Sequence, residues 1–116
     1  MTSNLYWVYI TCSGREEART IGRNLLEQRL AACVNIFEKM ESMYWWQGRI
    51  EAGEEAVLVA KTRQDRLEKL TEAVKAKHSY EVPCVVALPV AAGSEDYLNW
   101  LHGELDSSAA GGRVPG

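Results

Sequence analysis

The spacing of apolar and polar positions along the chain predicts seven elements. Short runs rich in Tyr, Trp, Val and Ile predict strands at 5–11, 31–44, 55–62 and 82–91. Apolar residues at helical spacing predict helices at 13–30 and 65–77 and a last helix from about residue 95. The order strand, helix, strand, strand, helix, strand is the split-βαβ arrangement. The sequence therefore predicts an α+β fold, a ferredoxin-like sandwich with an extra C-terminal helix.

Capping residues predict where the first two helices begin. Ser13 and Glu16 have the spacing of a capping box, and Asp65 stands three residues before Glu68. An aromatic turn is expected at 45–49 and a second turn at 52–53.

One sheet face is expected to lack a covering layer, because both crossover helices of this topology lie on the same side. Tyr6 or Trp7, with part of the 84–90 run, would lie on that open face. An apolar face of this kind favours association, so an oligomer is expected. The strand at 82–91 is the most hydrophobic, which predicts a central position in the sheet.

Length and charge limit the classes of function. The 116 residues suit one domain, expected over 1–106, with a small, Gly-rich and disordered tail at 107–116. A net charge of −3, and a 55–62 strand without aromatic residues, argue against nucleic-acid binding. The longest apolar run has eleven residues, too few to span a membrane. The chain also has no recognisable targeting segment, so a cytoplasmic protein without a membrane partner is expected.

Candidate chemistry is concentrated where the second helix gives way to the last strand, in the segment His78-Ser79-Tyr80-Glu81-Val82-Pro83. Together with Lys61, at the end of a neighbouring strand, three of its side chains would form a small polar cluster: His78, Tyr80 and Glu81. Such a cluster suits an anionic or amphoteric small ligand. The alternative is a hydrogen-bond network between subunits, and for His78 alone a helix-ending role.

The three cysteines are expected to be reduced, because their number is odd and none forms a CxxC pair. Cys33 is expected to pack in the core. Cys12 is either a packed strand-end residue or a soft metal ligand, and Cys84 is a packed or a reactive thiol. His102 is expected on the surface.

Five segments, read in order, resemble the CutA family of divalent-cation-tolerance proteins. They are Arg29 to Ile36, Ser42 to Glu51, Val57 to Thr62, His78 to Pro83 with Ala87 to Val90, and Gly93 with Tyr97, Leu98 and Trp100. The resemblance spans roughly residues 6–105. It implies a subunit related to the PII signalling proteins and a tight homotrimer, with Tyr44, Trp45 and Trp46 at the subunit contacts.

The resemblance also implies a link to tolerance of copper and other divalent cations. Copper ligands proposed in the family are a cysteine and two adjacent histidines. The cysteine and the second histidine correspond here to Cys12 and His78, whereas Lys77 stands where the first histidine would be. Two ligands make a weak site, so copper binding is expected to be weak.

Two functions follow from the sequence. The first is a trimeric protein that binds a metal ion or a small ligand between subunits without catalysis, since no known catalytic motif is present. The alternative is an enzyme of unknown chemistry, acting at clefts between subunits with Lys61, His78, Tyr80 and Glu81.

Overall fold

The structure is a computed structural model that describes residues 4–106. Its strands are β1 (Leu5–Cys12), β2 (Cys33–Trp46), β3 (Arg49–Arg63) and β4 (Val85–Pro89). Its helices are α1 (Arg15–Glu27), α2 (Leu67–Lys77) and α3 (Glu95–Asp106), with a 3-10 turn, η1 (Gln64–Arg66), leading into α2. The predicted order of elements is confirmed. The predicted tail at 107–116 lies outside the described residues.

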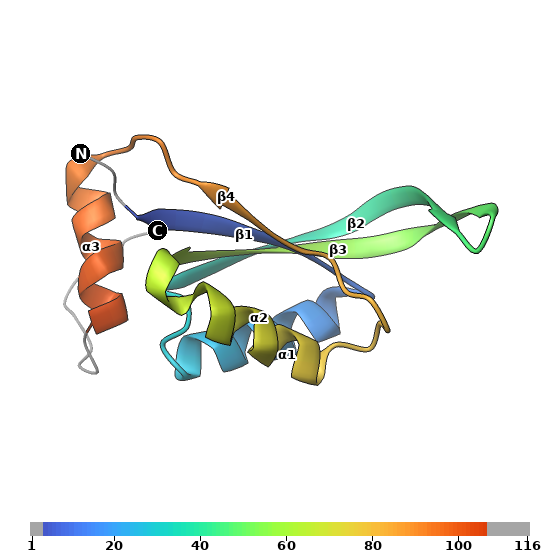
Figure 1. Cartoon of the computed structure of the whole chain (residues 1–116), viewed down its shortest axis with the longest axis horizontal. Helices are drawn as coiled ribbons and strands as arrows, with labels where there is room; N and C mark the ends of the chain where they lie inside the picture. Colours follow the sequence, from blue (N-terminus) through green and yellow to red (C-terminus); the bar gives the residue numbers. More distant parts are fainter. Residues whose placement is uncertain (1–3, 107–116) are drawn as a thin grey trace.

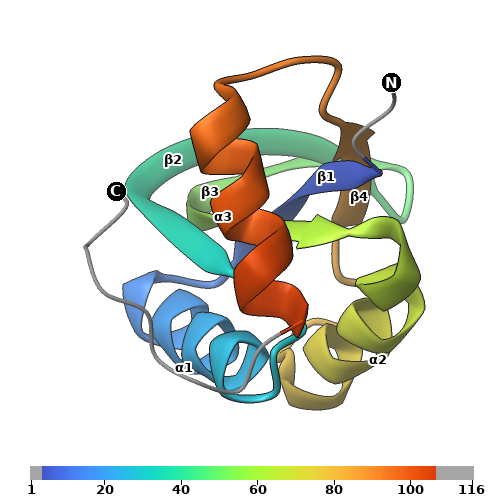
Figure 2. The same ribbon diagram turned by 90° about the vertical axis from the view of Figure 1, so that its left-hand side faces the viewer.

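The four strands form one antiparallel sheet in the order β2-β3-β1-β4. Helices α1 and α2 lie side by side on one face, and α3 crosses one end of the sheet (Figures 1 and 2). This arrangement confirms the predicted fold class. No helix within residues 4–106 is both long and apolar enough to cross a membrane.

The core lies between the sheet and the two crossover helices. Alternate residues of β1 face it, because side chains of a strand point to opposite faces in turn. They meet the apolar stripes of both helices in one cluster whose largest members are Val8, Ile10, Ile21, Leu25, Leu30, Leu58, Leu70 and Val74. A smaller cluster, Leu5 with Leu101 and Leu105, fixes α3 to the end of the sheet.

The other sheet face is open and apolar, as the sequence predicted. Trp7, rather than Tyr6, lies on this face, since its neighbour Val8 points into the core. Trp7 is 46% exposed, and Val86 and Leu88 of β4 are each 50% exposed. The expected association of this face with other subunits stays a prediction.

The prediction that the last strand is central is wrong. Strand β4 lies at the sheet edge and, within the described residues, pairs with β1 alone. The strand is apolar on both faces for a different reason. Val85 packs against the core, whereas Val86 and Leu88 lie on the open, apolar face of the sheet.

Strands β2 and β3 continue past the rest of the sheet as a hairpin, the arm, formed by residues 40–55 (Figure 1). Gln47 and Gly48 make its two-residue turn with φ values of 51° and 79°, the signs of a type I′ turn. The expected second turn at 52–53 is wrong, because Gly53 pairs with Ser42 in the ladder. A bulge between Phe37 and Met40 separates the arm from the sheet.

Neither predicted capping box forms. Asp65 lies in η1 and accepts a hydrogen bond from Arg63 Nε at 2.8 Å. Helix α1 begins after Gly14 without a side-chain cap, and Glu17 rather than Glu16 returns to the Ser13 backbone N–H. Because Glu17 rather than Glu16 makes this bond, the Glu17 carboxylate lies in the candidate site.

Candidate functional site

The segment from His78 to Cys84, here called the joint, starts where α2 ends. His78 leaves the helix in extended geometry, and its side chain has no exposed surface. Its Nδ1 accepts the backbone N–H of Tyr80 at 3.1 Å, so the ring proton lies on Nε2, which donates to the Thr11 carbonyl at 2.7 Å. Both ring nitrogens therefore have partners, and the imidazole ties the joint to the end of β1.

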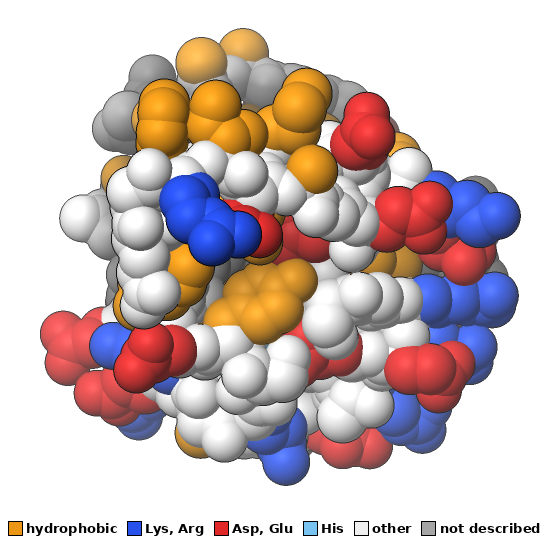
Figure 3. All heavy atoms as spheres, turned by 90° about the vertical axis from the view of Figure 1, so that its right-hand side faces the viewer, with side chains coloured by type: hydrophobic (Ala, Val, Ile, Leu, Met, Phe, Trp, Pro, Cys, Tyr) orange, Lys and Arg blue, Asp and Glu red, His pale blue; other side chains and the backbone are white. Residues whose placement is uncertain are grey.

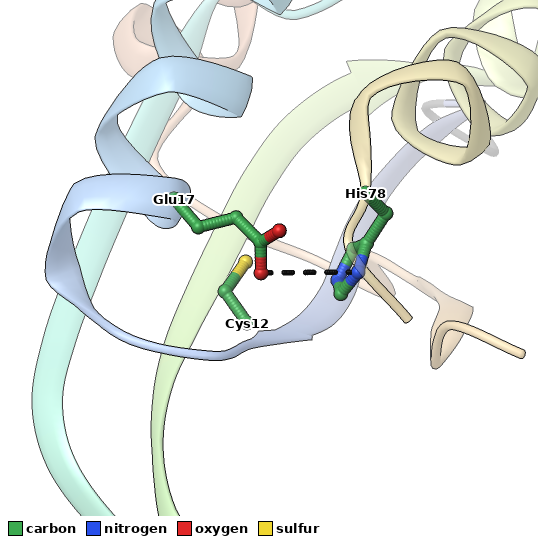
Figure 4. Close-up of side chains that lie close together, drawn as sticks. All are labelled: Cys12, Glu17 and His78. Carbon is green, nitrogen blue, oxygen red and sulfur yellow. Dashed lines mark ion pairs between the residues drawn. The ribbon is translucent and has the colours of Figure 1, made fainter. Parts of the chain in front are cut away.

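The side chain of Glu17, on α1, points toward His78 (Figure 4). Its carboxylate accepts the backbone N–H of Ser13 at 2.8 Å and of Ser79 at 2.7 Å, and one oxygen lies 3.8 Å from His78 Nδ1. Burial acts to raise the pKa of Glu17, but the hydrogen bonds from Ser13 and Ser79 outweigh it, so the pKa is lowered. The carboxylate is thus held ionised between two loops.

Cys12, which is buried, completes a cluster with these two residues, here called the trio. One ligand atom from each of Cys12, Glu17 and His78 lies within 4.8 Å of the others. Burial, and then the carboxylates of Glu17 and Glu55, raise the pKa of the Cys12 thiol to about 12. The thiol is therefore protonated near neutral pH, because each of these influences opposes a thiolate.

The trio offers the sulfur, nitrogen and oxygen donors that copper or zinc accepts. Each donor is already committed, however: the thiol keeps its proton, and the imidazole and carboxylate take part in hydrogen bonds. A metal would have to displace a proton and break the bond from Tyr80 N–H to His78. The trio consequently fits a metal in donor type but is not a preformed metal site.

A cavity of about 490 Å³ opens beside the trio, between the base of the arm and the joint. Figure 3 looks onto this end of the molecule and shows a hollow with hydrophobic and acidic side chains in and around it and a basic side chain at its edge. The arm contributes Ser42, Met43, Tyr44, Trp46 and Glu55; Thr11 comes from β1, and the joint contributes Tyr80, Glu81, Val82 and Cys84. We call this the arm cavity.

Tyr80 links the two features. Its backbone N–H binds His78 of the trio, and its hydroxyl donates to Glu55 Oε2 at 2.7 Å in the wall of the arm cavity. Burial, together with this bond and the nearby carboxylates, raises the pKa of the Tyr80 phenol. The phenol is therefore a fixed hydrogen-bond donor that holds the carboxylate in place.

The structure separates Lys61 from the other predicted cluster residues within one chain. Lys61 lies opposite Trp7 in the sheet, four residues of β1 away from Thr11, which is about 13 Å at the usual strand rise. Its Nζ donates to the Tyr97 hydroxyl at 3.0 Å and lies 5.4 Å from the Trp7 ring centroid. Within one chain Lys61 and His78 are therefore not grouped, because β3 carries Lys61 toward α3. The cluster expected between subunits stays a prediction.

The other predicted residues divide between the cavity and the surface. Tyr44 and Trp46 line the arm cavity, and Trp45 is 72% exposed. Their role in a subunit interface stays a prediction. Cys84 lines the cavity and Cys33 packs beside the α3 cluster, both half-buried. The expectation that His102 is a solvated surface residue needs correction in part, since its Nδ1 lies 3.4 Å from Arg63 Nη1.

Sequence reasoning missed Glu17 and Glu55 as site residues. Glu17 lies one position after the acid that the capping pattern favoured, and Glu55 stands at the start of an expected strand. A local signal for Glu55 was absent, because its role depends on the pairing of Met40 with Glu55 at the base of the arm.

Several known proteins are similar to this chain in sequence. The family profile described as CutA1 divalent ion tolerance protein matches residues 6–104. The chain is 50% identical over 95 residues to the divalent-cation tolerance protein CutA of Thermus thermophilus, covering 82% of this chain and 92% of that protein. It is 47% identical over 94 residues to the chloroplastic CutA protein of Arabidopsis thaliana, covering 81% of this chain but 52% of that longer protein.

A solved structure is also similar to this chain. The structure of the periplasmic divalent cation tolerance protein CutA from Archaeoglobus fulgidus superposes with a TM-score of 0.84 at 42% identity, covering 87% of this chain and 98% of that one. The names of these relatives mention a chloroplast or a periplasm, so the cytoplasmic location expected for this chain stays a prediction. The match over most of the sequence, with the same fold, shows that the chain belongs to the CutA family of divalent-cation-tolerance proteins.

Proposed function

We propose that this chain is a trimeric, non-catalytic binding protein that serves divalent-cation tolerance by binding a small ligand or a metal ion at the joint. The arm cavity is the favoured site, and the trio is its structural support. The supporting observation is the position of Tyr80, which is fixed through its backbone by His78 and through its hydroxyl by Glu55. A wall held at both ends suits a preformed pocket.

The ionisation of the joint supports a role without catalysis. Acid–base catalysis at neutral pH needs a group whose pKa is near 7 and that is free to exchange a proton. The Cys12 pKa of about 12 and the raised pKa of Tyr80 disfavour a nucleophilic thiolate or phenolate. His78 uses both ring nitrogens in hydrogen bonds. These groups are better suited to holding a shape than to transferring protons.

Copper or another divalent cation is the second proposed ligand, with Cys12, Glu17 and His78 as its donors. Because the site is not preformed, metal uptake would release the thiol proton and detach His78 from the Tyr80 backbone. Binding at the trio is therefore expected to be weak and to weaken further as pH falls.

The trimer is proposed because two apolar surfaces of the chain are not covered by any of the described residues, 4–106. They are the open sheet face around Trp7 and the part of the arm at Trp45, which is 72% exposed and does not line the arm cavity. Large aromatic side chains typically anchor subunit interfaces. Size-exclusion chromatography with light scattering is expected to give three times the chain mass at micromolar concentration; a monomer would refute this part.

The binding proposal is tested with the full chain in two titrations. A thermal-shift screen of small polar molecules is expected to find ligands whose stabilisation is lost in Tyr80→Ala but kept in Glu72→Gln, an exposed change on α2. Calorimetry with Cu²⁺ is expected to show weak binding. Tight stoichiometric copper binding that is abolished in Cys12→Ala, with no small-molecule hit, would move the function from the cavity to the trio.

A further inference from the structure

The arm cavity carries two carboxylates without a cationic partner. Glu55 and Glu81 both line it, and no Lys, Arg or His side chain of residues 4–106 lies within ion-pair distance of either. Arg49, near the tip of the arm, is paired with Glu51 at 3.8 Å. Apart from the Tyr80 hydroxyl, Glu55 has no hydrogen-bond donor among the described side chains. Glu55 is half-buried and Glu81 is exposed, so both carboxylates are available to a cationic ligand.

Aromatic rings surround the same carboxylates. Tyr44 and Trp46 enter the cavity from the arm, and Tyr80 enters from the joint. The face of an aromatic ring attracts a cation, and the attraction increases when water is excluded. Met43 and Val82 supply apolar contact in the same lining. Rings and aliphatic groups would remain unused by a bare metal ion, which is bound by oxygen, nitrogen or sulfur ligands.

We infer that the arm cavity binds a small organic cation, a protonated amine attached to an apolar body. The ammonium group would lie between Glu55 and Glu81, and its apolar body would contact Tyr44, Trp46 and Val82. The volume of about 490 Å³ lies within the range for small-molecule sites, roughly 300–1,000 Å³. This inference rests on the proposed binding function and specifies its ligand class. It also differs from the sequence expectation of an anionic or amphoteric ligand, which depended on Lys61.

The test compares three probes that share one ring and differ in charge: benzylammonium, benzyl alcohol and benzoate. Each is titrated at pH 7 into the full chain, with binding followed by ligand-observed NMR and calorimetry. Benzylammonium is expected to bind at least about tenfold more tightly than benzyl alcohol, the factor that a cation–π contact and a carboxylate together support. Benzoate is expected not to bind, because like charges would meet in the cavity.

Two carboxylate variants locate the site. Glu81→Gln and Glu55→Gln keep a hydrogen-bonding side chain of similar size, and each is expected to weaken benzylammonium about tenfold without changing benzyl alcohol. Glu72→Gln removes one negative charge from α2, outside the cavity, and is expected to leave all three affinities unchanged.

The outcomes separate the ligand class from the binding function. Benzoate or benzyl alcohol binding as tightly as benzylammonium, with sensitivity to Tyr80→Ala, would overturn the cationic class and leave the cavity as the site. Equal loss of benzylammonium in Glu72→Gln would show a general charge effect and would also overturn the class. No response of any probe, and no small-molecule hit that depends on the cavity, would overturn both proposals.

Discussion

Replacing Glu17 with Gln tests how the joint is held. Glu17 is the acceptor that the sequence pattern did not favour, and its two oxygens receive N–H groups from loops 66 residues apart, at Ser13 and Ser79. In Glu17→Gln one oxygen becomes an amide NH₂ that faces a backbone donor. One N–H group loses its acceptor, while the size of the side chain is kept.

The magnitude follows from hydrogen-bond energetics. A hydrogen bond typically contributes about 0.5–1.5 kcal/mol net to stability. The donors Ser13 and Ser79 are both exposed, so water replaces the lost acceptor in part. We expect Glu17→Gln to lower the free energy of unfolding by about 0.5–1.5 kcal/mol at pH 7 and to speed amide exchange at one of the two N–H groups.

The assay is guanidinium unfolding at one fixed protein concentration, together with amide hydrogen exchange. Glu16→Gln is the matched control, because Glu16 is exposed and stands at the position that the capping pattern predicted. It is expected to change stability by less than about 0.5 kcal/mol. An effect of Glu16→Gln equal to that of Glu17→Gln would refute the assignment.

The pH dependence gives a second check. The pKa of Glu17 is lowered in the folded chain, so its contribution is fully present above the unfolded value of about 4.3. That contribution is lost as pH falls through the lower folded pKa. The stability difference between Glu17→Gln and the unaltered chain should thus be constant near neutral pH and shrink in acid. A difference that grew in acid would contradict the reasoning.

Three further predictions follow from other contacts. Cys12 is fully buried and its pKa is about 12, so iodoacetamide should label Cys84 before Cys12 in the native chain; mass spectrometry showing equal labelling would contradict this. Thr62→Val removes the 2.6 Å hydrogen bond from a buried hydroxyl to the Leu30 carbonyl and should destabilise by about 1–3 kcal/mol in guanidinium unfolding. Gly48→Ala places a side chain at a φ of 79° and should destabilise the arm by about 1–2 kcal/mol, which exchange of the hairpin amides would detect.

The candidate site was only partly predictable. The sequence singled out His78, Tyr80 and Glu81 because polar groups between a helix and a strand stand out locally. The sequence analysis placed Lys61 with them because Lys61 lies near the end of a strand and they lie near the end of a helix. The structure shows that these ends are different ends of the sheet, since Lys61 pairs with Trp7 near the start of β1 and His78 bonds Thr11 near its finish.

Spacing along the chain determined the order of elements and which segments form helices or strands, because periodicity is a local property. Tertiary structure alone decided that β4 lies at the edge and that Glu17 rather than Glu16 binds Ser13. It also formed the arm cavity, since the ladder register opposes Met40 to Glu55 and places the aromatic residues of the arm beside the joint. Register and packing set the distances between elements, and no local pattern encodes those distances.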